Sequence, residues 1–206
     1  MRKSIVVGRM TMLDKYHVIL ASNSPRRREL LAGLGVDFEV RTLPGIDESY
    51  PSDLKRGDIP LYIAKEKADA YRSKIGNNDL VITADTIVWL DGEVLGKPVD
   101  RDEAIMMLKK LSGRTHQVYT GVALTTKDWQ RSFSVETHVR FAPLKEENII
   151  FYVDHYRPFD KAGAYGVQEW IGYIGVEGLE GSYYNVMGLP VQRLFKEIEK
   201  IEQSVL

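Results

Sequence analysis

The chain has 206 residues, 44% of them hydrophobic, which suits one ordinary domain or two small, closely packed lobes. Its formal net charge is −1 at pH 7, so no global basic field exists to hold nucleic acid, no stable nucleic acid partner is expected, and any polyanion site must be local. It contains no cysteine, which excludes disulfides, thiolate metal ligands and a cysteine nucleophile and suits a reducing cytosol.

The first 17 residues are interpreted as an N-terminal extension, because their apolar run is short and is broken by Gly8 and Arg9. We therefore expect residues 18–206 to form a single domain. No stretch of the sequence reaches the roughly 20 apolar residues that a membrane-spanning helix needs. The sequence thus predicts a cytoplasmic protein with no membrane partner.

Strands and helices alternate along the chain, and long paired strands with outer helices predict an α/β fold with a mixed sheet. The sequence predicts strands at 17–21, 36–41, 80–90, 117–125 and 132–141 and helices at 25–34, 59–75, 100–113, 145–154 and 189–201. Ser24 is a good N-cap with Pro25 at the first helical position, and Asp100 with Glu103 forms a capping-box-like start. Residues 157–184 are interpreted as a Gly-rich, aromatic-rich loop region.

The segment ILASNSPRRRELL places a helix start and three arginines directly after a buried strand. Free backbone N–H groups and the helix dipole at such a start attract anions. Ser22 and Ser24 add hydroxyl donors, and Arg26 and Arg27 add planar guanidinium groups that suit phosphate oxygens. Three adjacent helical residues span about 300° of the helix, so Arg28 is expected to point elsewhere. The alternative is a solvated helix face that binds nothing.

Asp85 lies inside the apolar strand VITADTIVWL, where a carboxylate is costly unless it is paired, hydrogen-bonded or bound to metal. Thr86 follows it on the opposite pleat. Lys97 comes after a hairpin that can return it to the strand, so the pair predicts either a phosphate site with a base or metal ligand, or a structural ion pair. In the loop GIDESY, Glu48 beside Asp47 adds further carboxylates, which are usually only solvated.

Lys67, in the helical segment AKEKADA, has only a weak claim to a role by itself, since lysines on helix surfaces are normally solvated. The loop FDKAGAYGVQ carries Asp160, Lys161 and Gln168 among glycines and aromatic residues. Such loops can form a wall that recognises a base, although many simply cover a core.

Several segments, in this order, resemble the Maf family of nucleotide pyrophosphatases: LASNSPRRRELL, KEKA, ADTIV, GKP, LSGRTHQVYTGVAL, DKAGAYGVQ and EGSYYNVMGLP. The resemblance spans about residues 18–195. It implies a mixed, elongated sheet flanked by helices, with two lobes around a cleft, similar to inosine triphosphate pyrophosphatases. It also implies hydrolysis of a nucleoside triphosphate to the monophosphate and pyrophosphate with Mg²⁺ or Mn²⁺, and it is compatible with a homodimer.

The resemblance assigns site residues by position. Asp85 matches the proton acceptor. The residues that match the polar groups around the triphosphate are Ser22, Arg26, Glu48, Lys67 and Lys97. Glu48 and Asp85 would bind the divalent metal through hard oxygen ligands.

Arg27, Thr86 and Gln168 match the positions that sort the family by substrate, and their combination resembles the branch acting on dTTP and UTP. The chain departs from the family pattern at Arg157 and at the pair Glu169–Trp170, which leaves the substrate range open. Modified pyrimidine nucleotides are one alternative. Another is a nucleotide- or DNA-binding regulator of cell division and septum formation without catalysis.

Overall fold

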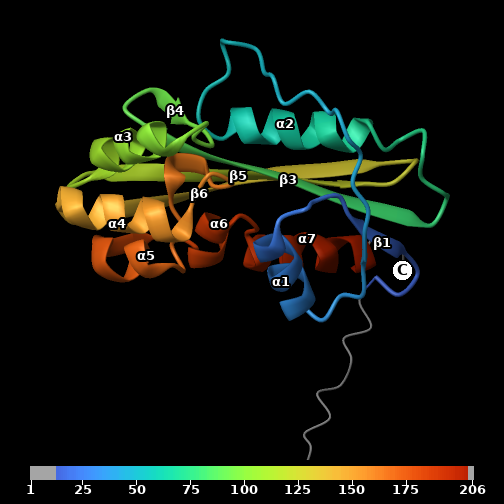
Figure 1. Ribbon diagram of the computed structural model, residues 1–206. Coiled ribbons are helices and arrows are strands. Elements are labelled where there is room, and N and C mark those ends of the chain that lie inside the picture. The colour runs from blue at the N-terminus through green and yellow to red at the C-terminus, as the bar shows by residue number, and fades with distance from the viewer. Residues whose placement is uncertain (1–12, 204–206) are drawn as a thin grey trace, which may run out of the picture.

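The computed structural model describes residues 13–203, and these form one elongated seven-stranded sheet with helices against both faces (Figure 1). The strands are β1 (His17–Leu20), β2 (Glu39–Val40), β3 (Asp79–Leu90), β4 (Glu93–Leu95), β5 (Thr115–Thr125), β6 (Gln130–Phe141) and β7 (Val176–Glu180). The helices are α1 (Pro25–Gly33), α2 (Asp58–Asp69), α3 (Arg101–Leu111), α4 (Glu146–Tyr156), α5 (Trp170–Gly175), α6 (Tyr183–Met187) and α7 (Val191–Gln203). Among the described residues, no helix combines the length and apolarity that crossing a bilayer requires.

The sheet is mixed, as predicted. Its order is β2-β1-β3-β5-β6-β7, with β4 paired to β3 as a hairpin. β1 runs parallel to both β2 and β3, whereas the long strands β3, β5 and β6 pair antiparallel. Helix α2 covers one face of β3 and β5, while α6 packs against β5 and β6 (Figure 1). The strands β3 and β5 therefore form a rigid platform that carries side chains toward both layers.

The predicted helix starts are confirmed. The Ser24 hydroxyl accepts a hydrogen bond from the backbone N–H of Arg27 at 3.4 Å, and the Asp100 carboxylate accepts one from the N–H of Glu103 at 2.8 Å. These contacts satisfy N–H groups that have no partner inside the helix. The sequence thus located the first turn of α1, which forms part of the site described below.

Several boundaries differ from the prediction. Helix α2 ends at Asp69, six residues early, and β2 has two residues where six were expected. The predicted loop over 157–184 contains a 3₁₀ turn at Ala162–Ala164, α5, β7 and the start of α6. These helices are too short for a readable periodicity, and β7 exists because it pairs with the edge of β6, a contact that the local sequence does not encode. The extension predicted for residues 1–17 falls mostly outside the described residues.

A buried aromatic cluster supports one end of the sheet. His116 is fully buried, its Nε2 lies 2.7 Å from the Tyr165 hydroxyl, and its ring packs edge-on against Phe141 and Tyr165. Burial lowers the pKa of His116 to about 3. The imidazole is therefore neutral in the folded protein at any pH near neutrality.

We expect the protein to lose stability as pH falls below about 6.5, the pKa of histidine in the unfolded chain. There the unfolded state binds a proton that folded His116 does not take up, and the loss reaches about 2 kcal/mol between pH 7 and pH 5. Urea unfolding of the wild type and His116→Phe at both pH values measures this loss. The mutant should lack that part of the pH dependence, and an unchanged dependence would exclude His116 as its source.

Candidate functional site

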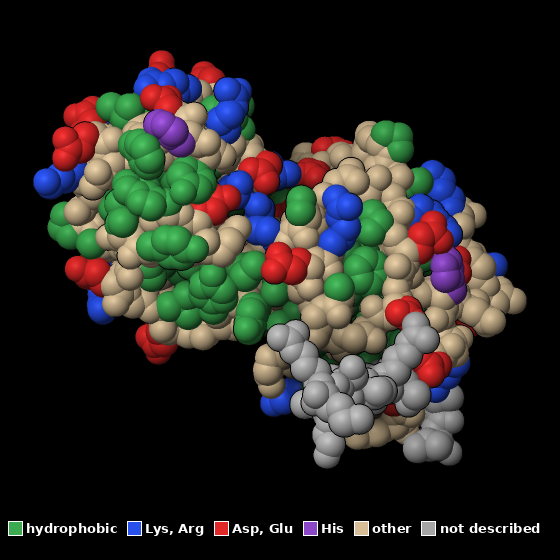
Figure 2. All heavy atoms as spheres, turned by 60° about the horizontal axis from the view of Figure 1, so that its bottom comes forward, with side chains coloured by type: hydrophobic (Ala, Val, Ile, Leu, Met, Phe, Trp, Pro, Cys, Tyr) green, Lys and Arg blue, Asp and Glu red, His purple; other side chains and the backbone are tan. Residues whose placement is uncertain are grey.

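A cleft of about 540 Å³ opens where two lobes meet, and its walls come from segments far apart in the sequence. These segments are the β1–α1 turn, the loop over 42–48, α2, the middle of β3, the loop that carries Lys97, and the loops over 160–168 and 186–188. Figure 2 shows charged side chains gathered in the hollow between the lobes. Every side chain that the sequence assigned to a site lines this cleft.

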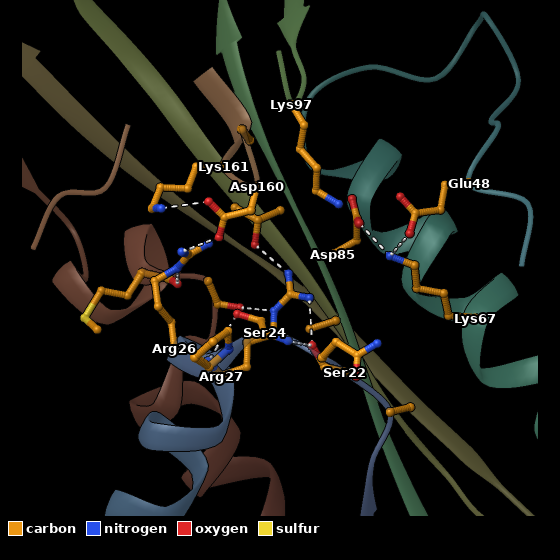
Figure 3. Close-up of a pocket in the computed structure, with 18 of the residues that line it drawn as sticks. Ser22, Ser24, Arg26, Arg27, Glu48, Lys67, Asp85, Lys97, Asp160 and Lys161 are labelled. Atoms are coloured by element: carbon orange, nitrogen blue, oxygen red, sulfur yellow. Dashed lines mark hydrogen bonds and ion pairs between the residues drawn. The ribbon is translucent and has the colours of Figure 1, made fainter. Parts of the chain in front are cut away.

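The β1–α1 turn forms one wall of the cleft (Figure 3). Arg27 reaches from α1 into the protein interior, where its Nε donates to the carbonyl of Gly188 at 2.8 Å and its Nη2 to the Thr86 hydroxyl at 3.1 Å. Its Nη1 also approaches the Ser22 hydroxyl at 3.5 Å. Burial lowers the pKa of the guanidinium, and the carboxylate of Asp85 opposes that effect. Arg27 thus fixes the relative positions of the turn and β3.

Arg26 and Arg28 point in different directions. Arg26 lines the cleft, with its Nε 3.3 Å from the carbonyl of Met187 and its Nη1 3.2 Å from the Asp160 carboxylate. Arg28 is exposed and donates to the backbone oxygen of Asn23 at 3.0 Å, away from the cleft lining. The prediction that Arg28 points elsewhere is therefore confirmed.

The opposite wall holds two carboxylates that share one ammonium group. The Nζ of Lys67 lies 2.8 Å from Asp85 Oδ1 and 2.9 Å from Glu48 Oε1. Burial alone would raise the pKa of Glu48, but the hydrogen bond and charge of Lys67 leave it below its usual value. Lys97 points toward the same cluster (Figure 3). Asp47, the neighbour of Glu48 in the sequence, instead accepts hydrogen bonds from Ser49 within its own loop.

The ion pair that the sequence left open, between Asp85 and Lys97, is replaced by the pair of Asp85 with Lys67. Strand alternation explains why β3 serves both walls. Asp85 faces α2 and meets Lys67, while Thr86 faces the other layer and meets Arg27 and, at 2.9 Å, the Thr120 hydroxyl. The predicted opposite orientation of Asp85 and Thr86 is confirmed.

The loop over 160–168 closes the remaining side of the cleft. Gln168 lines it, and its Oε1 is buried without a hydrogen-bond partner among the described residues. The sequence named Asp160 and Lys161 but gave them no role, although both line the cleft and Asp160 pairs with Arg26. The only local signal was an adjacent acid and base in a Gly-rich loop. Their partners lie more than a hundred residues away or across the loop, so spacing does not reveal them.

A metal fits the carboxylate pair only together with a ligand that supplies more oxygens. Within residues 13–203, no group of three or more His, Cys, Asp or Glu side chains is arranged to hold a metal ion. Glu48 and Asp85 already share one positive charge, that of Lys67. Mg²⁺ commonly uses one or two carboxylates and completes its shell with waters and substrate phosphates, so this pair suits a cation that binds alongside a phosphate ligand.

Comparisons with known proteins identify close relatives over nearly the whole chain. A protein from Bacteroides thetaiotaomicron called dTTP/UTP pyrophosphatase is 64% identical over 92% of this chain and 98% of its own length. A Porphyromonas gingivalis protein of the same name is 54% identical over 93% of this chain and 98% of its own. The solved structure of a HAM1 protein from Coxiella burnetii aligns over 90% of this chain and 99% of that one with a TM-score of 0.48 and 15% identity, too remote to support a conclusion.

The model of a family described as Maf-like protein matches residues 17–201, which contain both walls of the cleft. That span and the close full-length relatives show that this chain belongs to the Maf family.

Proposed function

We propose that this chain hydrolyses dTTP and UTP to the monophosphate and pyrophosphate. The relatives that carry the name dTTP/UTP pyrophosphatase support this choice of substrate. The observation that carries the proposal is the cleft itself, where the anion-binding start of α1 faces a mostly buried Asp85 across one cavity. A site for polyphosphate binding alone has no use for a carboxylate in that position, because it repels the ligand.

The residues divide the work between holding phosphates and moving a proton. In the proposed complex, the Ser22–Ser24 turn and the N–H groups of α1 bind phosphate oxygens. Arg26, Lys67 and Lys97 neutralise the charge that develops on the leaving pyrophosphate, and such charge stabilisation supplies most of the acceleration in phosphoryl chemistry. Asp85 accepts the proton of the water that attacks the α-phosphorus.

We further propose that Glu48 and Asp85 hold Mg²⁺ or Mn²⁺. When bound, this cation would supply positive charge to the phosphate oxygens and lower the pKa of the attacking water. Lys67 lies between the same two carboxylates, so its positive charge offsets their mutual repulsion before substrate binds. A homodimer belongs to the same proposal and rests on the family resemblance. A cytoplasmic location also belongs to it and suits a chain without cysteine.

Pyrophosphate release from a panel of nucleoside triphosphates tests the proposal. With Mg²⁺ or Mn²⁺ present we expect release from dTTP and UTP, and with a chelator we expect none. Release from 7-methyl-GTP in place of these would support the proposed reaction but contradict the proposed substrates. Release from modified pyrimidine nucleotides alone would make dTTP a surrogate, and release from no nucleotide would overturn the enzymatic function.

Gln168→Glu is expected to lower kcat/KM for UTP about tenfold or more while GTP turnover changes little, so the UTP-to-GTP ratio falls. The Gln168 amide can donate to O4 and accept from N3–H, the edge that thymine and uracil share. Its buried Oε1 has an unused acceptor for that N–H, and glutamate removes the donor and adds charge. Gln192→Glu makes the same change at an exposed position outside the cleft and should have no effect. An unchanged ratio in Gln168→Glu would remove this residue from base recognition.

A further inference from the structure

Four charged side chains of alternating sign form a row that starts behind the cleft lining and ends in the cleft: Glu169, Lys161, Asp160 and Arg26. The Nζ of Lys161 lies 3.2 Å from Glu169 Oε1 and 2.7 Å from Asp160 Oδ1. The other oxygen of Asp160, Oδ2, lies 3.2 Å from Nη1 of Arg26. Figure 3 shows the Lys161, Asp160 and Arg26 part of this charge row. The row connects the loop that carries Gln168 to helix α1.

The far end of the row is anchored on helix α4. Tyr152 is fully buried, and its hydroxyl donates a hydrogen bond to Glu169 Oε2 and accepts one from the backbone N–H of Gly166 at 3.0 Å. A Cβ at Gly166 would lie 2.8 Å from the carboxyl carbon of Glu169, so the absence of a side chain there makes room for the carboxylate. The position of Glu169 is thus fixed by a buried side chain and by the shape of the loop.

Burial makes Lys161 depend on Glu169. The Lys161 side chain is only 9% exposed, whereas its other partner, Asp160, is 58% exposed. A buried ammonium group needs close compensating charge, and a largely exposed carboxylate is screened by water. Glu169, at 20% exposed, is the better shielded of the two partners. It therefore holds the ammonium group in place.

The orientation of Asp160 depends on its contact with Lys161. Asp160 uses one carboxylate oxygen for Lys161 and the other for Arg26, so its orientation is fixed only while Lys161 stays in position. If Lys161 were released from Glu169, it could draw Asp160 away from Arg26. Arg26 would then lose one of the two contacts, with Asp160 and with the carbonyl of Met187, that hold its guanidinium at the cleft.

We propose that Glu169 is a positioning residue that, through Lys161 and Asp160, holds Arg26 in the orientation that receives a substrate phosphate. This inference rests on the proposed function for the ligand that Arg26 meets. It gives Glu169, a residue at which the sequence departs from the family pattern, a part in the reaction without contact to substrate.

A double-mutant cycle with Glu169→Gln and Asp160→Asn tests the inference. Glutamine keeps the size of glutamate and an oxygen for Tyr152 but cannot pair with the ammonium group. Alone, Glu169→Gln should lower kcat/KM for dTTP about fivefold, the scale of one partly exposed ion pair. In the Asp160→Asn background it should have no further effect, because the connection to Arg26 is already cut. Glu147→Gln, an exposed residue of α4, is the matched control and should be silent.

Additive effects in the cycle, or wild-type activity in Glu169→Gln, would overturn the inference. A merely structural role would lower the melting temperature and would act equally in both backgrounds. Should Glu169→Gln fail to fold, Tyr152→Phe keeps the ring and removes the hydroxyl that holds the carboxylate and that also accepts from the Gly166 N–H. It should lower kcat/KM about two- to threefold, again only while Asp160 is present.

Binding of α,β-imido-dUTP, measured by calorimetry in the same variants, separates this inference from the proposed function. If the wild type binds the analogue but releases no pyrophosphate, the function fails and the dissociation constants still test the charge row. If the wild type hydrolyses dTTP and Glu169→Gln matches Glu147→Gln, the charge row fails and the function stands. No binding and no turnover by the wild type would overturn both.

Discussion

Asp85→Asn is expected to lower kcat for dTTP and UTP at least about 100-fold, the usual contribution of a general base. Asparagine keeps the size of the side chain and an oxygen for Lys67, but it cannot take up the proton of the attacking water. Pyrophosphate release under saturating dTTP and metal measures the loss. Asp154→Asn removes an exposed carboxylate that pairs with Arg101 outside the cleft, and it should retain full activity.

Nucleotide binding should survive in Asp85→Asn, because the serine turn, the α1 N-terminus and Arg26 are all retained. The dissociation constant of α,β-imido-dUTP, titrated at several Mg²⁺ concentrations, shows whether the loss lies in the chemical step or in binding of the cation. Retention of more than about a tenth of the wild-type rate, roughly 1.4 kcal/mol of barrier, would remove Asp85 from the central role.

The wall of the cleft that the β1–α1 turn forms could be predicted from the sequence, because it is one contiguous segment. A strand, a Ser-Asn-Ser turn, Pro25 and a capping Ser24 specify the start of α1, and the structure has it there. Asp85 also stood out, because a carboxylate within an apolar strand needs a partner. Local chemistry was sufficient for both, since each depends on residues within a few positions.

The residues that pair with Asp85 and Arg26 could not be predicted from the sequence. Lys67 lies 18 residues before Asp85 on a helix that gave no sign of facing the strand, and the partner that the sequence offered as one alternative was Lys97. Asp160 meets Arg26 across 134 residues. Such pairs arise from the packing of layers, which depends on strand order and register, and a single sequence does not fix either. The family resemblance identified Lys67 as a site residue, whereas the charge row became visible only in the structure.

The close approach of α2 to the sheet is one such feature, and it depends on Gly121. This glycine lies in β5 directly opposite Asp85 of β3, beneath the first turn of α2. A Cβ on Gly121 would lie 2.3 Å from the backbone nitrogen of Leu61 and 2.4 Å from the carbonyl oxygen of Pro60. That is about 1 Å short of ordinary van der Waals separation, and backbone atoms of a helix cannot turn aside as a side chain can.

Gly121→Ala is therefore expected to displace α2, and Lys67 with it, away from Asp85. Overpacking of this kind costs about 3 kcal/mol, which lowers the melting temperature of a chain this long by about 6–12 °C. A displacement of about 1 Å at a catalytic group can cost about 100-fold in rate, so kcat should fall well beyond what the lost stability explains at 25 °C. Thermal melts and dTTP turnover at that temperature measure the two effects separately.

Gly33→Ala is the matched control, because nothing lies within 4 Å of the Cβ it would add at the end of α1. It should leave turnover unchanged and can gain up to about 1 kcal/mol from better helix propensity. If Gly121→Ala melts and turns over like Gly33→Ala, α2 can move without cost and the spacing between helix and sheet does not set the Lys67–Asp85 contact. If it loses stability but keeps its rate, the contact survives the displacement, and Lys67 reaches Asp85 by the flexibility of its own side chain.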